Sequence, residues 1–153
     1  MLFEFDELAS QRARIKVLGV GGAGGNAINR MITSGMDGVE FIAINTDAQD
    51  LGSNPAETKL QIGKDLTKGL GAGAKPEIGR KAIMHDTDAL KSLVAGSDLV
   101  FVTAGMGGGT GTGAAPIIAR MAKEMDILIV GIVTMPFQFE GNVSLDQAQK
   151  GLE

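Results

Sequence analysis

Glycine is the residue that most constrains this chain, because 23 of the 153 residues are glycine and many of them gather in three short segments. The segments cover residues 19–25, 69–73 and 105–113. Glycine is about twice as frequent as in average proteins, and it follows no collagen-like repeat. Such clusters indicate places where the backbone turns sharply or approaches another group closely.

Apolar runs alternate with helical patterns around these glycine segments. We predict strands at residues 14–20, 39–45, 59–62, 99–103 and 127–134. We predict helices at residues 26–34, 76–84, 87–95, 116–125 and 144–153, with Asn26 and Pro116 at helix starts. Continuous apolar strands that alternate with helices are typical of an open parallel α/β sheet, Rossmann-like, with helices on both faces. We expect the last strand to be buried on both faces.

The composition excludes several classes of function. The formal net charge is −4, and the chain has no cysteine and one histidine, which leaves no disulfide framework, zinc knuckle or thiol nucleophile. A chain without a basic stripe is a poor ligand for nucleic acid. No apolar run is long enough to span a bilayer, and acids interrupt the N-terminus where a signal peptide needs an apolar core. We therefore expect a cytoplasmic chain without direct membrane binding, with a flexible tail at residues 1–13 and one domain at 14–153.

The first glycine segment fits a nucleotide-binding fingerprint. Gly19, Gly21 and Gly24 have the G-x-G-x-x-G spacing after a predicted strand, and Asp47 follows the next strand. This pattern alone is also compatible with a dinucleotide-dependent (NAD) oxidoreductase. A tight strand-to-helix turn that binds nothing is a further interpretation of the same spacing, so the alternatives stay open at this point.

The third glycine segment favours a nucleoside triphosphate. Residues 107–113 read GGGTGTG between a predicted strand and a helix, and so many bare backbone positions form a nest of N–H donors, with threonine hydroxyls beside them. Two such loops can hold different phosphates of one ligand. The P-loop alternative fails because Gly63-Lys64 is followed by Asp65. Phosphate charge would be met by helix N-termini and a phosphate-bound Mg²⁺, with no metal held directly by the protein.

Five ordered motifs then resemble the tubulin/FtsZ family of cytoskeletal GTPases, in its N-terminal nucleotide-binding domain. They lie at residues 17–32, 41–51, 69–79, 107–113 and 136–141. The resemblance implies that the chain binds GTP or GDP. It implies these nucleotide-binding residues: Gly21, Gly22, Ala23, Asn26, Asp47, Ala72, Gly73, Gly105, Gly107, Gly108, Gly109, Thr110, Gly111, Thr112, Pro136, Glu140 and Ser144.

The resemblance also implies roles for single residues. Asn26 lies on the base side, Ala72 and Gly73 approach the γ-phosphate, and Glu140 takes the ribose. By the same resemblance Asp47 lies near the γ-phosphate, and we interpret Asp47 and Asp50 as an edge of the site. The full-length family polymerises head to tail in bacterial cell division, at a division ring at midcell, with further cell-division partner proteins.

Three departures from the family pattern alter the expectation. Ser144 replaces a usual Arg, and Asp126 stands where a helix-end Gly is common. The chain stops before the family's central helix and second domain, so no catalytic residue is expected within it: hydrolysis needs an acidic loop of the adjacent subunit. We expect a domain that binds nucleotide, hydrolyses it poorly, and self-associates with or caps full-length subunits. A non-binding interaction module, or a truncation too poorly packed to fold, remains the third possibility.

Overall fold

The computed structural model describes residues 12–137 and 140–153. The strands are β1 (Ile15–Val20), β2 (Glu40–Asn45), β3 (Thr58–Gln61), β4 (Leu99–Gly105) and β5 (Leu128–Thr134). The helices are α2 (Gly21–Thr33), α3 (Ala48–Ser53), α4 (Lys64–Thr67), α5 (Pro76–His85), α6 (Thr87–Val94), α7 (Thr110–Glu124) and α8 (Asn142–Leu152). Most of the expected tail at residues 1–13 lies outside the described residues.

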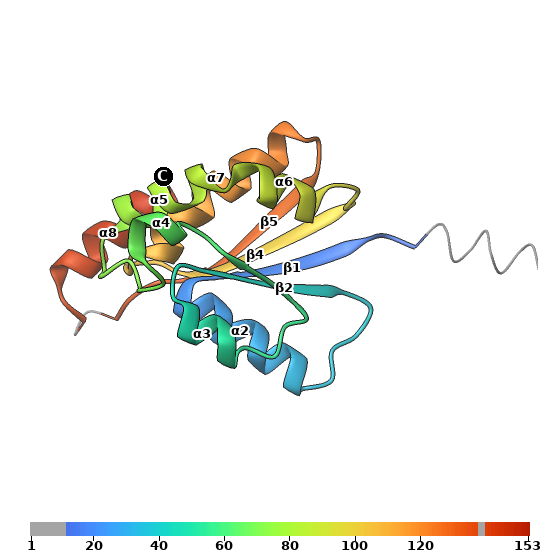
Figure 1. Ribbon diagram of the computed structural model, residues 1–153, viewed down its shortest axis with the longest axis horizontal. Helices are drawn as coiled ribbons and strands as arrows, with labels where there is room; N and C mark the ends of the chain where they lie inside the picture. Colours follow the sequence, from blue (N-terminus) through green and yellow to red (C-terminus); the bar gives the residue numbers. More distant parts are fainter. Residues whose placement is uncertain (1–11, 138–139) are drawn as a thin grey trace, which may run out of the picture.

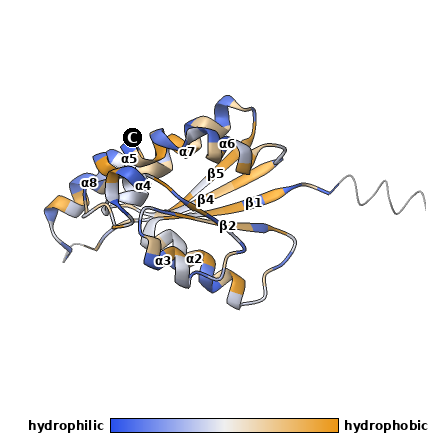
Figure 2. Cartoon of the chain, viewed as in Figure 1, coloured by the Kyte–Doolittle hydropathy of each residue, from blue (hydrophilic) through white to orange (hydrophobic). Residues whose placement is uncertain are grey.

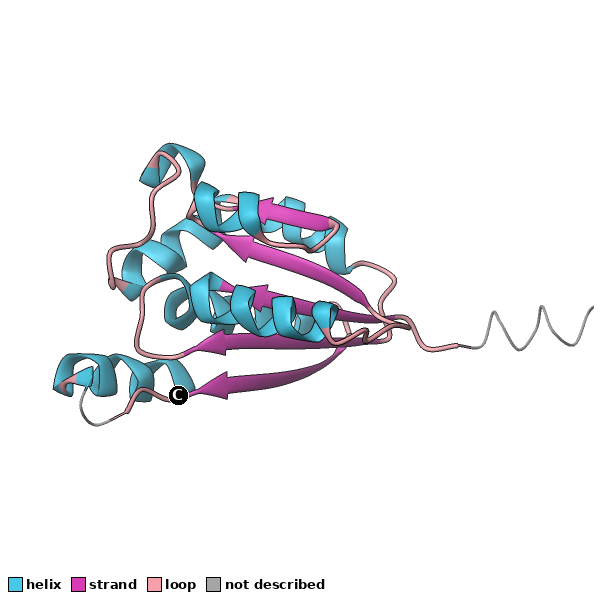
Figure 3. Ribbon diagram, turned by 90° about the horizontal axis from the view of Figure 1, so that it is seen from below, coloured by secondary structure: helices cyan, strands magenta, loops and turns pink. Residues whose placement is uncertain are grey.

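The five strands form one parallel sheet in the order β3-β2-β1-β4-β5. All strand arrows point the same way in Figure 3. Strands β2 and β3 lie on one side of β1, and β4 and β5 lie on the other side. The order reverses between β1 and β4, and in open α/β sheets ligands bind beyond the carboxyl ends of the strands at this kind of reversal. The predicted parallel α/β sheet is confirmed.

Helices cover both faces of the sheet, as predicted (Figure 1). Helices α2 and α3 lie on one face, where Ile28 and Leu51 pack with Val17 and Ala43. Helices α5, α6, α7 and α8 lie on the other face and share the larger core cluster with the strands. Figure 2 shows the central strands coloured as hydrophobic between the two helical layers. Among the described residues, no helix is both long and apolar enough to cross a bilayer.

Two helix starts differ from the sequence prediction. Helix α2 begins directly after β1 at Gly21, so Asn26 lies inside it and does not cap it. Helix α7 begins at Thr110, and Pro116 lies inside it. Half of the GGGTGTG segment is therefore the first turn of a helix and not a loop. Tertiary packing of Thr110 and Gly111, both buried, outweighs the weak helix propensity of this segment.

Strand β5 also differs from the prediction, because it is an edge strand and is largely exposed. Leu128 is 65% exposed and Ile132 is 50% exposed, whereas Ile129 and Val133 pack against the core. Val130 pairs in register with Phe101, on the face that α2 covers at the centre of the sheet. Helix α2 packs over β1, β2 and β4 and leaves this side of β5 open.

The C-terminal end of α7 confirms one concern raised by the sequence. Asp126 follows this helix with φ of 57°, in the left-handed region that favours glycine. Its backbone N–H donates to the carbonyl of Lys123, which ends the helix. Asp126 therefore stands in a position for which glycine is better suited.

Candidate functional site

A cleft of about 600 Å³ lies at the carboxyl ends of the strands, at the reversal of strand order between β1 and β4. Its size falls in the usual range for small-molecule sites, about 300–1,000 Å³. Segments far apart in sequence meet there, because the carboxyl ends of parallel strands all lie at one edge. Its lining residues are Val20, Gly21, Gly22, Ala23, Asn45, Asp47, Asp50, Gly71, Ala72, Gly105, Met106, Gly108, Gly109, Thr110, Gly111, Thr134, Met135, Pro136, Phe137 and Glu140.

Two helices direct their N-termini at this cleft. Helix α2 starts at Gly21 and α7 at Thr110, and within the described part of the chain neither start has a side-chain cap. The two starts adjoin: a Cβ at Gly21 would lie only 3.0 Å from the backbone nitrogen of Gly111. The first N–H groups of a helix lack partners inside the helix and carry its positive dipole end. The cleft is therefore built to receive an anion with several acceptor oxygens.

Glycine leaves the backbone accessible at two points of the cleft. Gly22 and Gly108 are exposed, and a Cβ at Gly108 would meet no atom within 4 Å. Gly109 differs, because a Cβ there would lie 2.6 Å from the Cβ of Ala72. The absence of a side chain at Gly109 thus lets the 71–75 turn close over the start of α7.

The threonines of the GGGTGTG segment have other partners than expected. The Thr110 hydroxyl lies 3.0 Å from the Thr46 hydroxyl in a buried pair. The Thr112 hydroxyl accepts a hydrogen bond of 2.8 Å from the Gly107 N–H, and Thr112 does not line the cleft. These hydroxyls hold the start of α7 in place, and Thr110 also lines the cleft.

Carboxylates line one side of the cleft. Asp47 caps α3, with Oδ1 accepting from the N–H groups of Gln49 at 2.9 Å and Asp50 at 3.2 Å. Asp47 Oδ2 would lie 3.8 Å from a Cβ added to Gly71. Asp50 Oδ2 would lie 3.6 Å from a Cβ added to Gly22. Asp47 therefore has one oxygen engaged in a structural cap and a second oxygen on the cleft side.

Glu140 is on the opposite rim, where its Oε1 accepts from the Phe137 N–H at 3.2 Å. Across the ranges 12–137 and 140–153, no three acidic or histidine side chains come together as a metal cage. The carboxylates of Asp47 and Asp50 are hard oxygen donors beside a phosphate-sized anion site, which suits a Mg²⁺ held mainly by phosphates.

The structure brings twelve of the seventeen predicted site residues to the cleft and leaves five away from its lining. Asn26 lines an adjoining space of about 50 Å³ between α2 and α3. Gly73, with φ of 60°, lies in the turn beside Ala72. Gly107 and Thr112 are buried beneath the cleft, and the carbonyl oxygen of Ser144 would lie 2.9 Å from a Cβ on Gly107.

Sequence reasoning missed several residues that line the cleft. Asn45 ends β2 buried, and its Oδ1 accepts from the Asp47 N–H at 3.2 Å. A polar residue at the end of an apolar strand was a signal that could have found it. Met106, Thr134 and Met135 gave no such signal, because they reach the cleft only through the pairing of β4 with β5.

Comparison with known proteins agrees with this geometry. The GTPase domain of the Tubulin/FtsZ family matches residues 14–153. The cell division protein FtsZ of Coxiella burnetii (strain RSA 493 / Nine Mile phase I) is 54% identical over 152 residues, which are 99% of this chain and 39% of that protein. The chain thus spans about two fifths of this relative's length.

Solved structures show the same fold. The empty FtsZ dimer of M. jannaschii matches with a TM-score of 0.93 and 45% identity over 99% of this chain and 44% of that one. CetZ2 from Haloferax volcanii, in a GTPγS-bound protofilament, matches with a TM-score of 0.77 and 30% identity, over 91% of this chain and 45% of that one. These matches give no support to the oxidoreductase alternative. The chain belongs to the tubulin/FtsZ family, whose GTPase domain matches residues 14–153.

Proposed function

We propose that this chain binds GTP and GDP in the cleft, as the nucleotide domain of an FtsZ-like cytoskeletal protein of bacterial cell division. The observation that carries the proposal is the meeting of two uncapped helix N-termini, of α2 and α7, at one cleft of about 600 Å³. Two adjoining positive helix ends suit a ligand with several linked phosphates. Membership of the family supports guanine as the base, which the cleft residues do not select by themselves.

The phosphates would lie against the first turns of the two helices. Gly22 and Ala23 would donate backbone N–H groups from α2, and Gly108 to Gly111 from the start of α7. The turn at Ala72 and Gly73 would approach the terminal phosphate. Glu140, on the far rim, would accept a hydrogen bond from a ribose hydroxyl. Ser144 is too short to make the nucleotide contact of the arginine that the family usually has at this position. Asn26, one turn further along α2, would reach the base side.

A phosphate-bound Mg²⁺ would neutralise part of the ligand's charge and stabilise the bound triphosphate. Asp47 and Asp50 are the carboxylates near enough to the predicted phosphate positions to hold its waters. Because Asp47, Asp50 and Glu140 make the lining of the cleft acidic, nucleotide affinity should rise when Mg²⁺ is added. The measurement is the ratio of dissociation constants for GTP with and without Mg²⁺.

Hydrolysis is expected to need a second subunit. Phosphoryl transfer depends on positioning a water and stabilising charge, and the family supplies the group that orients the water from the adjacent subunit. This chain would then retain GTP with little turnover and associate with the exposed end of an intact subunit, capping a filament at a cytoplasmic division ring. Substoichiometric addition to a full-length FtsZ would shorten filaments and lower GTP turnover. Unchanged filament length and turnover would contradict capping without touching nucleotide binding.

The direct test of nucleotide binding is calorimetric titration of the purified chain with GTP and GDP in the presence of Mg²⁺, with ATP and NADH as controls. We expect saturable binding of the guanine nucleotides only. Tight NADH binding without GTP binding would instead favour an oxidoreductase. If the chain melts cooperatively and binds no nucleotide, it is folded without a working nucleotide site, and binding to other proteins would be its remaining function.

A variant locates the binding in the cleft. Gly108→Asp places a carboxylate at a point where a side chain meets no atom within 4 Å, so the fold should survive. Repulsion with the phosphates should weaken GTP binding about 10- to 100-fold, equivalent to about 1.4–2.7 kcal/mol. Gly52→Asp is the matched control, since a side chain on this exposed α3 residue also meets nothing within 4 Å and Gly52 does not line the cleft. Equal affinities of the two variants would place the nucleotide elsewhere.

A further inference from the structure

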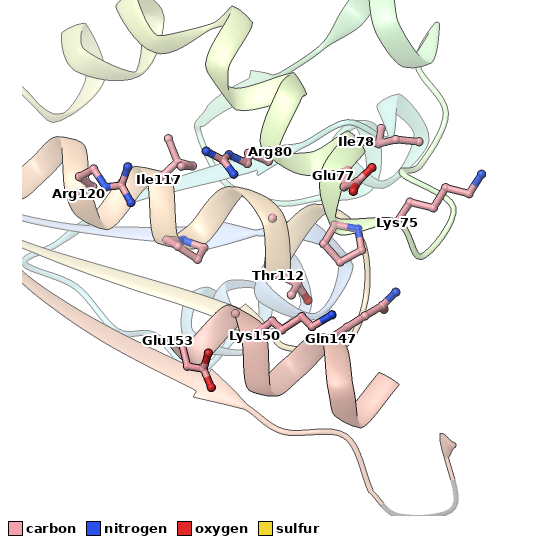
Figure 4. Close-up of a pocket in the computed structure, with 14 residues that line it drawn as sticks. Lys75, Glu77, Ile78, Arg80, Thr112, Ile117, Arg120, Gln147, Lys150 and Glu153 are labelled. Carbon is pink, nitrogen blue, oxygen red and sulfur yellow. The ribbon is translucent and has the colours of Figure 1, made fainter. Parts of the chain in front are cut away.

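A second concavity lies between helices α5, α7 and α8, away from the nucleotide cleft. It is a groove of about 580 Å³, and its lining differs from that of the cleft. Figure 4 shows its side chains, with Arg80 and Arg120 toward one end and Lys75 and Gln147 toward the other. The lining residues are Lys75, Pro76, Glu77, Ile78, Arg80, Thr112, Gly113, Pro116, Ile117, Arg120, Gln147, Lys150, Gly151 and Glu153. Nothing in the proposed nucleotide chemistry uses this groove.

The groove is lined by one face of each helix. Helix α7 contributes residues at spacings of one, three and four, from Thr112 through Gly113, Pro116 and Ile117 to Arg120. Helix α8 contributes Gln147, Lys150 and Gly151, and α5 contributes its first turns. Residues three and four apart share a helix face. Three helix faces thus converge on one groove of about 580 Å³.

Close packing holds the walls of the groove together. A Cβ at Gly113 would lie 1.9 Å from the Pro76 carbonyl oxygen, so α5 and α7 touch through backbone. A Cβ at Gly151 would lie 2.9 Å from the Thr112 methyl group, so α8 also packs closely on α7, through a side chain. The Gln147 amide donates to the Ala74 carbonyl at 3.1 Å and ties α8 to the segment before α5. The groove is therefore preformed, which lowers the cost of binding.

The lining combines a small apolar floor with a cationic rim. Ile78, Pro116 and Ile117 are the apolar side chains of this floor. Four exposed cations surround this floor and two acidic side chains, Glu77 and Glu153, accompany them. Within residues 12–137 and 140–153, no ion pair holds any of the four cations, which are Lys75, Arg80, Arg120 and Lys150. A locally positive groove on a chain of net charge −4 is complementary to a negative partner.

We propose that this groove binds an amphipathic helix of a partner protein, with a narrow apolar stripe on the floor and glutamate or aspartate residues on both flanks. In the helix-in-groove mode an amphipathic helix lays its apolar face into an apolar groove, and the unpaired cations select an acidic ligand. A flat anionic bilayer is a poorer fit, because Pro116 and Gly113 are recessed between α5 and α8. This binding is independent of the nucleotide in the cleft.

The test is an NMR titration of the isotope-labelled 153-residue chain with a synthetic acidic peptide of about four helical turns. The peptide carries alanine and leucine at spacings of three and four and glutamate on either side, and a second peptide has lysine in place of every glutamate. We expect saturable shifts of the groove amides of α5, α7 and α8 with the acidic peptide, weakening as salt rises. Absence of saturable shifts at millimolar peptide, or equal binding of the lysine peptide, would overturn the proposal.

Charge reversal separates the groove from general attraction. The double variant Arg80→Glu/Arg120→Glu should weaken peptide binding about tenfold or more, because it reverses two rim charges. The control Lys81→Glu/Lys123→Glu makes the same charge change on exposed residues of α5 and α7 that do not line the groove, and should stay within about twofold. Thermal melts of both variants establish that they fold. Equal losses in the two variants, or loss of binding to phosphatidylserine vesicles specific to the first, would contradict a helix-binding groove.

Discussion

The two glycine segments that open helices at the cleft resemble each other in sequence but differ in what their glycines contact. After β1, Gly24 brings α2 against the sheet: a Cβ there would lie 2.4 Å from the Thr103 carbonyl oxygen of β4. After β4, Gly113 brings α7 against another helix, through Pro76 of α5. Each segment also has one exposed glycine on the cleft, Gly22 or Gly108. Glycines in similar sequence patterns can therefore have different roles: one lets a helix pack on the sheet, another lets two helices pack together, and a third leaves the backbone open to the cleft.

Substitution of Gly113 should have the largest effect on stability. In Gly113→Ala the added methyl would lie 1.9 Å from a backbone oxygen, and two helices must separate to accept it. We expect a loss of about 3 kcal/mol or more in the free energy of unfolding, measured by urea denaturation. Gly52→Ala, with no atom within 4 Å, is the control. A wild-type denaturation midpoint for Gly113→Ala would show that α5 and α7 do not meet through backbone.

Substitution of Gly24 tests the corresponding contact on the sheet. In Gly24→Ala the methyl meets the Thr103 carbonyl oxygen at 2.4 Å, and α2 must move away from β4. We expect a loss of about 2–3 kcal/mol in the same denaturation measurement. The neighbouring Gly25→Ala is matched, because its methyl meets only the Asn54 side-chain nitrogen at 3.3 Å, which can shift. Similar losses in both variants would remove the distinction between packed and tolerant glycines in α2.

Asp126 provides the converse case, a position where glycine is missing. Its φ of 57° is strained for a residue with a side chain, so Asp126→Gly should stabilise the chain by about 0.5–1 kcal/mol. Asp126→Ala should destabilise it, because alanine tolerates this backbone region less well than aspartate. Thermal melting of the three proteins gives the order. Stabilisation by alanine as well would show that backbone strain is not the cause.

Gly108 should show the smallest change in stability. Because a Cβ there meets no atom within 4 Å, Gly108→Ala should change the free energy of unfolding by less than about 0.5 kcal/mol. The methyl projects into the cleft, so GTP affinity in calorimetry should fall although stability does not. A large loss of stability would mean that the two segments do not divide their glycines between packing and access.

Much of the fold was predictable from local patterns. All five strands and the parallel sheet follow from apolar runs, and α5 begins at Pro76 as its sequence predicts. The short helices α3 and α4 were missed, because a capping Asp47 and a left-handed Gly63 signal a turn as readily as a helix. Twelve of the predicted site residues line the cleft, since the motifs that carry them follow strand ends.

The sequence by itself determined the strands, their alternation with helices, the family and the edge of the sheet where the cleft lies, because these depend on residues near one another in the chain. Only the tertiary structure decided that Asn26 and Pro116 lie inside helices, that β5 is exposed, and that the Thr110 and Thr112 hydroxyls have protein partners. It also decided which glycines are packed and which are open. The physical reason is that packing and exposure depend on what lies opposite a residue in space, and segments distant in the chain supply those neighbours.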